Sequence, residues 1–109
     1  GCEECVVCSS LLRRYTAGGV RASLQPHYDE TALATAVLSL SAPEDYTGGL
    51  VVQSGAAVRT RRLLRLGQGD LVFHRSSLRH GVDVQGGTRY SLILWFSSSS
   101  EACREKAMP

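Results

Sequence analysis

The sequence lacks long apolar runs and is poor in aromatic residues. It has no apolar stretch of about 18 residues, as a membrane-spanning helix needs, and no charged start followed by an apolar segment, as in signal peptides. It therefore indicates neither membrane insertion nor secretion, and it favours an intracellular location. Only 6% of the residues are aromatic. None lies within the main arginine cluster, as stacking on bases would require, so no nucleic-acid partner is signalled.

Lysine is also nearly absent, because 11 of the 12 basic residues are arginines, and the net charge is only +2. Arg59, Arg61, Arg62 and Arg65 lie close together. In a regular strand Arg59 and Arg61 would share one face. We interpret the cluster as a solvated outer face or a hairpin near a barrel rim, with a site for an anionic partner as the alternative.

The length and the spacing of turns predict one all-β domain. A chain of 109 residues, 43% of them hydrophobic, suits a single compact core. Turn signals rich in Gly, Pro, Asp and Ser separate short apolar segments, which is typical of a sandwich or barrel. The predicted strands lie near residues 11–15, 20–29, 34–41, 50–53, 57–66, 70–73, 81–84 and 89–96. Residues 101–106 could add a short C-terminal helix.

The most informative motif is His27-Tyr28-Asp29 together with His80. Two imidazoles and one carboxylate can occupy one face of an iron(II) octahedron and leave three positions open for a co-substrate and dioxygen. On a strand, His27 and Asp29 would share a face and Tyr28 would pack on the other. Because metal binding needs an ionised carboxylate and neutral imidazoles, we expect metal occupancy to fall in acid.

A second motif follows nine residues after His80. In the run from Arg89 to Phe96, strand alternation places Arg89, Ser91, Ile93 and Trp95 on one face. A guanidinium presents a planar fork of donors that matches a carboxylate, and the Ser91 hydroxyl can add one hydrogen bond. The pair is therefore suited to hold the far end of a dicarboxylate.

These motifs together resemble the 2-oxoglutarate- and iron(II)-dependent dioxygenases, in particular their prolyl 4-hydroxylase-like branch. Further segments in the same order as in that family are Tyr15-Thr16-Ala17-Gly18, Gly48-Gly49-Leu50 and Gly69-Asp70-Leu71-Val72-Phe73. The resemblance extends from about Leu11 to Phe96. It implies a double-stranded β-helix, also called a jelly-roll or cupin-like fold.

The resemblance also implies a function and a site. Residues 1–109 would form a single dioxygenase core, read as a fragment without the N-terminal helices that usually brace the sheet. Iron(II) would bind at His27, Asp29 and His80, and the C5 carboxylate of 2-oxoglutarate at Arg89 and Ser91. The implied reaction uses dioxygen to hydroxylate a C–H bond in a peptide, protein or small-molecule substrate, with a peptidyl, prolyl-type substrate favoured. It releases succinate and carbon dioxide, and ascorbate is an additional cofactor of such enzymes.

Two other functions stay open at this stage. A non-catalytic jelly-roll module derived from this family could bind a protein or an anionic ligand without turnover. A cupin-type isomerase or hydrolase could use the same metal without 2-oxoglutarate, but Arg89 would then have no purpose.

Several other residues are open to a structural interpretation. His74 is expected to be a loop residue or to lie near the substrate's access route rather than to bind metal. Trp95 and Phe96 are expected to pack in the core.

The four cysteines are Cys2, Cys5, Cys8 and Cys103. Their spacing does not complete an iron–sulfur or zinc motif. Free thiols in a reducing compartment are the default expectation. The alternative is a disulfide through Cys103 that ties the two ends of the chain together.

Overall fold

The computed structural model describes residues 4–106, which form seven strands, two 3-10 turns and one helix. The strands are β1 (Val6–Thr16), β2 (Ser23–His27), β3 (Ala34–Ser39), β4 (Tyr46–Gln53), β5 (Arg61–Leu64), β6 (Leu71–Arg75) and β7 (Arg79–Ser97). The turns are η1 (Pro43–Asp45) and η2 (Val58–Thr60), and the helix is α1 (Ser100–Lys106). The all-β prediction with a short C-terminal helix is confirmed.

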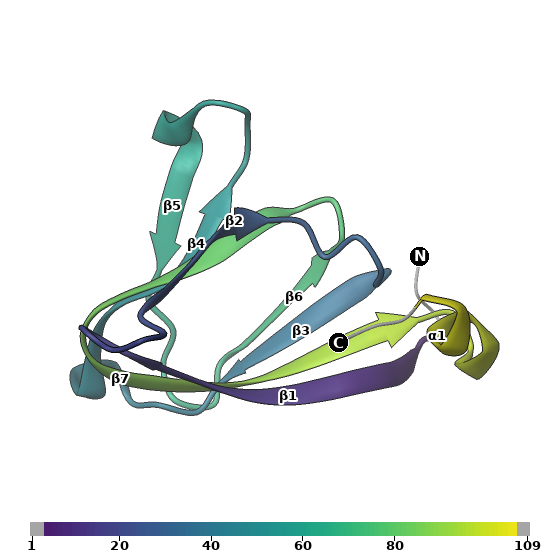
Figure 1. The fold of residues 1–109 in the computed structure, drawn as a ribbon, viewed down its shortest axis with the longest axis horizontal. Coiled ribbons are helices and arrows are strands. Elements are labelled where there is room, and N and C mark those ends of the chain that lie inside the picture. The colour runs from purple at the N-terminus through teal and green to yellow at the C-terminus, as the bar shows by residue number, and fades with distance from the viewer. Residues whose placement is uncertain (1–3, 107–109) are drawn as a thin grey trace.

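The long strand β7 organises the whole fold because it belongs to two sheets (Figure 1). Its first half pairs with β2 and β4, and β5 extends that sheet beyond β4. Its second half pairs with β1 and β3, and β6 extends that sheet beyond β3. All these pairings are antiparallel. The two sheets meet where β7 bends and diverge away from it, so they enclose a wedge-shaped interior.

The bend in β7 lies at residues 85–87, where the sequence predicts a turn between two strands. That prediction is wrong, because the strand continues through Gly86 and Gly87 into the other sheet. On β4, Thr47 pairs with Gly86 and Gly48 pairs with Val84, so Gln85 is an extra residue on β7. One inserted residue of this kind is a β-bulge, which bends a strand and increases its twist.

Half of the buried apolar residues form one cluster between the two sheets. The cluster consists of Tyr15 from β1, Tyr46 and Leu50 from β4, and Val82 and Val84 from β7. Tyr15 and Leu50 are 1% and 2% exposed. Both sheets therefore contribute to one core, as expected for a jelly-roll.

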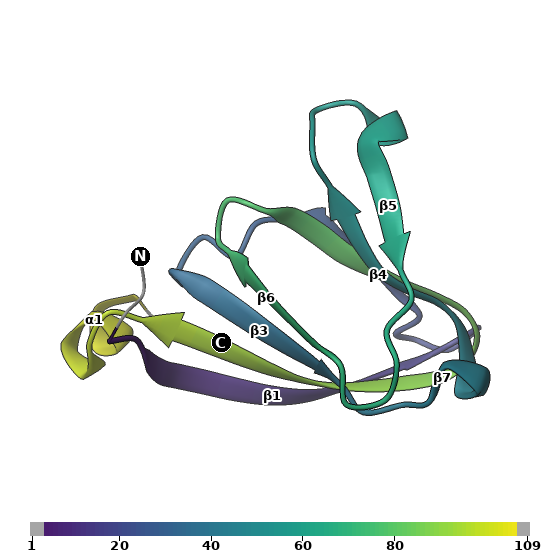
Figure 2. The same cartoon turned by 180° about the vertical axis from the view of Figure 1, so that it is seen from behind.

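The arginine cluster lies on the β4–β5 hairpin, which projects from the wedge, as Figure 2 shows from behind. Arg59 falls in η2 and not in a strand, so the prediction that it shares a strand face with Arg61 is wrong. Arg61 donates to Gln53 Oε1 at 2.7 Å. Arg65 donates to the carbonyls of Gly48, Pro43 and Tyr46. The expected hairpin is confirmed.

The cysteines differ from the expectation of free thiols. Cys8 on β1 forms a disulfide with Cys103 on α1, and their Cα atoms are 5.2 Å apart. Cys5 is also disulfide-bonded, and Cys2 lies outside the described residues. The alternative link through Cys103 is therefore the correct one. Disulfides persist mainly in oxidising compartments, so the reducing environment assumed for free thiols is not supported.

None of the described helices has the length and apolar character needed to cross a membrane.

Replacement of Gly87 should test the bend directly. Gly87 has φ +71°, and a Cβ there would collide with the Asp45 carbonyl. Gly18 is a matched control, because it has φ +73° but open space around its Cβ position. We expect Gly18→Ala to cost about 1 kcal/mol from the backbone alone and Gly87→Ala at least about 2 kcal/mol more. Urea unfolding measures both, and equal losses would contradict the proposed close packing at the bend.

Candidate metal centre and co-substrate pocket

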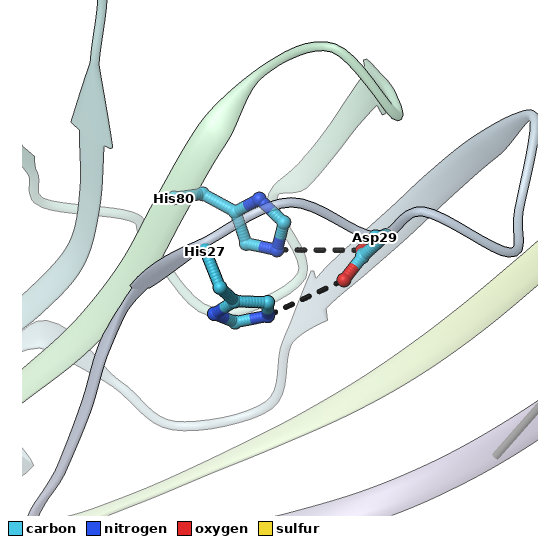
Figure 3. A group of neighbouring side chains, drawn as sticks. All are labelled: His27, Asp29 and His80. Atoms are coloured by element: carbon cyan, nitrogen blue, oxygen red, sulfur yellow. Dashed lines mark ion pairs between the residues drawn. The ribbon is translucent and has the colours of Figure 1, made fainter. Parts of the chain in front are cut away.

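The structure brings His27, Asp29 and His80 together, as Figure 3 shows. His27 Nε2 lies 3.3 Å from Asp29 Oδ1, and His80 Nε2 lies 3.3 Å from Asp29 Oδ2. One ligand atom from each residue lies within 4.8 Å of the other two. Adjacent positions of an octahedron with bonds of about 2.1 Å are roughly 3 Å apart. The donor atoms are somewhat further apart than this, so small side-chain movements would bring all three onto one face of a single metal ion.

The elements that carry the three residues differ from the sequence expectation in one respect. His27 is the last residue of β2 and pairs with His80 on β7, so the two imidazoles are cross-strand neighbours. Asp29 lies beyond the end of β2, in the connection to β3. The carboxylate is therefore placed by a turn of the chain and not by strand alternation.

Backbone carbonyls set the tautomer of both imidazoles. His27 Nδ1 lies 2.9 Å from the Gln25 carbonyl oxygen, and His80 Nδ1 lies 3.0 Å from that of Leu78. A carbonyl only accepts hydrogen bonds, so each Nδ1 is the donor and carries the hydrogen. In the neutral rings Nε2 then has a free lone pair, and both lone pairs face Asp29. This is the tautomer that a metal ligand of this kind needs.

The charges of the cluster are coupled. Burial alone would raise the pKa of Asp29. Hydrogen bonds from the protonated form of His80 and from Thr35, together with the positive charges of protonated His80 and His27, hold that pKa well below its usual range. Burial lowers the pKa of His80, yet its contacts with Asp29 and the Leu78 carbonyl raise it overall. Asp29 is therefore ionised at neutral pH, as a metal ligand must be.

Thr35 supports the carboxylate from behind. Its hydroxyl donates to Asp29 Oδ2 at 2.6 Å, and the residue is only 1% exposed. The bond fixes one carboxylate oxygen, whereas Oδ1 faces His27 Nε2 and accepts no hydrogen bond from other side chains in residues 4–106. Nothing in the sequence motif pointed to Thr35, although it is six residues from Asp29.

Arg89 lies in the same cavity as the three candidate ligands. The cavity has a volume of about 290 Å³ and is bounded by both sheets. Arg89 is 0% exposed, and none of its three side-chain nitrogens has a hydrogen-bond partner among the described residues. A buried guanidinium without a partner is strongly unfavourable. An anion bound in the cavity next to Arg89 would therefore stabilise the guanidinium.

Two tyrosines flank Arg89. Tyr15 pairs with it across β1 and β7, and its burial raises the pKa of the phenol, partly offset by the charge of Arg89. The ring of Tyr46 lies 5.9 Å from the Arg89 guanidinium carbon. Neither residue was singled out for this role from the sequence.

The predicted alternation after Arg89 is confirmed by the lining of the cavity. Ser91, Ile93 and Trp95 all line it together with Arg89. Trp95 is 6% exposed, so it packs as expected while forming part of the wall. Phe96 points to the other face, where its ring meets Phe73 at 5.6 Å in an edge-to-face contact.

Two smaller expectations are wrong. Tyr28 does not pack against the core: it is 47% exposed and lines the cavity, because β2 ends before it. His74 is not a loop residue. It lies on β6, is 7% exposed, and its ring centroid is 4.3 Å from that of His80. β6 extends two residues further than predicted, which takes His74 into the interior.

Comparison with known proteins gives the wider context. The sequence matches the profile of the 2OG-Fe(II) oxygenase superfamily over residues 10–97. A search of curated proteins found no match.

Three solved structures illustrate the fold. A 2OG-Fe(II) oxygenase family oxidoreductase from Burkholderia pseudomallei has a TM-score of 0.74 and 18% identity, over 89% of this chain and 47% of that one. A prolyl-4-hydroxylase from Pseudomonas putida has a TM-score of 0.67 and 23% identity, over 83% and 52%. A cupin domain from Bordetella pertussis has a TM-score of 0.56 and 12% identity, over 85% and 91%. The predicted double-stranded β-helix is thereby confirmed.

The chain spans about half the length of the two oxygenase structures that it matches. The profile match nevertheless covers most of the chain, including both histidines, Asp29 and Arg89. That family uses iron(II) and 2-oxoglutarate, and the His-Asp-His cluster offers a suitable metal site. The chain belongs to the 2OG-Fe(II) oxygenase superfamily.

Proposed function

We propose that residues 1–109 are the catalytic core of a 2-oxoglutarate-dependent iron(II) dioxygenase that hydroxylates a C–H bond and releases succinate and carbon dioxide. The observation that carries the proposal is the shared cavity, in which a His-Asp-His cluster and an unpaired buried guanidinium line one space. A peptidyl, prolyl-type substrate is favoured by the likeness to a prolyl-4-hydroxylase.

The residues present fit both groups that this chemistry needs. His27, Asp29 and His80 would hold iron(II), since two neutral imidazoles and one carboxylate on one face leave coordination positions open. Arg89 would hold the C5 carboxylate of 2-oxoglutarate, because its unpaired donors match a carboxylate fork. When bound, iron(II) and 2-oxoglutarate supply the oxidising power for dioxygen activation.

The protein's own part is orientation and exclusion of water. The Asp29 carboxylate offsets one of the metal's two charges, and the backbone carbonyls of Gln25 and Leu78 keep both imidazoles turned toward the metal position. Leu50 and Ile93 present apolar surface to the cavity. A cavity walled in this way strengthens the electrostatic contacts made inside it.

Loss of a candidate metal ligand should abolish turnover. We expect Asp29→Ala and His80→Ala each to eliminate iron-dependent succinate release, because a site with two protein ligands binds the metal weakly and in the wrong geometry. Succinate formation from 2-oxoglutarate, followed by mass spectrometry, is the measurement. Asp83→Ala removes a carboxylate from outside the cavity and should retain activity.

The succinate assay, together with binding measurements, also distinguishes the two alternative functions. Binding of manganese(II) and 2-oxoglutarate without any succinate release would favour the non-catalytic module. Turnover of a substrate that 2-oxoglutarate does not affect would favour a cupin-type isomerase or hydrolase.

Arg89 should act on co-substrate binding and not on the metal. We expect Arg89→Gln to raise the 2-oxoglutarate concentration for half-maximal succinate release by roughly 10- to 100-fold, the usual worth of a charge-assisted pair. Manganese(II) affinity should stay close to that of the wild type. Arg89→Lys keeps the charge but loses the planar fork, so an intermediate value is expected. A normal 2-oxoglutarate requirement in a folded Arg89→Gln protein would disprove the assignment.

Thr35 should act through Asp29. We expect Thr35→Val to weaken manganese(II) binding by roughly 10- to 100-fold, as is typical when the partner of a metal ligand is removed. The isosteric valine fills the same buried space but cannot donate to Asp29 Oδ2. Thr35→Ser keeps the hydroxyl and should bind manganese(II) nearly as the wild type does. Calorimetric titration gives both affinities, and an unchanged affinity in Thr35→Val would show that the bond does not support the ligand.

A further inference from the structure

We infer that Arg13 is a second anion-binding group of the cavity and that it selects a primary substrate carrying a carboxylate. The inference rests on the proposed function, because it assigns a substrate class to the same site. The evidence for it is separate from the evidence for the proposed function. It comes from a residue of β1 that is neither a candidate metal ligand nor the residue proposed to hold the C5 carboxylate of 2-oxoglutarate.

Arg13 lies on the inner face of the sheet that contains β1. It pairs with Ser91 across β1 and β7, and both residues line the cavity. Its Nε atom is buried and has no hydrogen-bond partner, and none of the acidic side chains among residues 4–106 forms an ion pair with it. The neighbouring Arg14 is exposed and takes no part in this cavity. Arg13 itself is half-buried, so the sequence pair Arg13-Arg14 directs one side chain toward the cavity and one away from it.

Arg13 and Arg89 are distinct positions in the cavity. Arg89 pairs with Tyr15, one inward-facing row closer to the bend of β7 than the row of Arg13 and Ser91. Such diagonal neighbours on one sheet face are about 7–8 Å apart at their side-chain bases. Thr35, which holds Asp29, pairs with Trp95 two inward-facing rows beyond Ser91. Arg13 therefore lies between the Arg89 row and the row that supports the metal cluster.

The balance of charge in the cavity favours a further anion. Its charged lining residues are Arg13, Arg89 and Asp29. With a divalent metal bound, two guanidiniums and the metal oppose one carboxylate, which leaves three positive charges. One 2-oxoglutarate dianion neutralises two of them. A single carboxylate on the substrate would neutralise the third, whereas a neutral substrate would leave a charge uncompensated in a partly enclosed space.

The experiment compares matched probes that differ in one charge. The protein is loaded with manganese(II) and 2-oxoglutarate, and fluorescence of Trp95 reports binding, since it is the only tryptophan and lines the cavity. The probes are N-acetyl-L-proline and its N-methylamide. We expect the acid to bind at least about tenfold more tightly, because a charge-assisted hydrogen bond typically raises affinity by that factor. Arg13→Gln should abolish the preference, and Arg14→Gln should retain it.

A second pair of probes identifies the source of the carboxylate. Acetyl-Asp-Pro-amide and acetyl-Asn-Pro-amide also differ in one negative charge. Here the charge lies on the side chain that precedes the proline and not on the proline itself. Preference for the aspartyl peptide, lost in Arg13→Gln, would assign the carboxylate to an acidic residue of a peptide. Preference only for N-acetyl-L-proline would assign it to a free acid.

The outcomes separate this inference from the proposed function. The wild type could bind 2-oxoglutarate and yet bind the charged and the neutral member of each probe pair equally well. That result would refute the role of Arg13 and leave the proposed function standing. If Arg13→Gln instead weakens 2-oxoglutarate binding and leaves probe selectivity intact, Arg13 belongs to the co-substrate and the inference is also refuted. Failure of the wild type to bind 2-oxoglutarate at all would refute the proposed function itself.

Discussion

The bulge in β7 is the constraint on which the site depends. In the first half of β7 the inward-facing residues have even numbers, His80, Val82 and Val84, whereas in the second half they have odd numbers, beginning with Arg89. A regular strand would send residues nine apart to opposite faces. The extra residue Gln85 and the positive φ of Gly87 reverse the alternation. His80 and Arg89 can thus line one cavity although they lie on one strand.

The sequence predicted the parts of the site that follow from local chemistry. The donor set of His27, Asp29 and His80 and the alternation from Arg89 to Trp95 could be read from residue types and spacing. The bulge could not be read in this way, because Gln85-Gly86-Gly87 has the composition of an ordinary turn. Its continuation as a strand depends on pairing with β4, a contact between residues about 40 positions apart in the chain. The interior position of His74 escaped prediction for the same reason, since it follows from the length of β6.

The residues that hold the ligands in place were the hardest to foresee. Thr35 acts on Asp29, and the carbonyls of Gln25 and Leu78 act on the imidazoles. None of these groups has a sequence signature, because a threonine on a strand or a backbone carbonyl occurs in every β protein. Only the three-dimensional contact gives them a function. The motif therefore specifies which atoms are available to bind a metal, and the fold specifies their tautomer, charge and orientation.

Strand β1 joins the disulfide between Cys8 and Cys103 to the cavity wall. β1 carries Tyr15 and Arg13, yet among the strands of residues 4–106 it pairs with β7 alone. An edge strand held on one side can slip in register, and a shift of one residue would turn Arg13 out of the cavity and bring Arg14 in. The disulfide from Cys8 to Cys103 joins the start of this strand to α1, which directly follows β7. A covalent tie at that point opposes such a slip, in addition to the pairing of β1 with β7 from Val6 to Thr16.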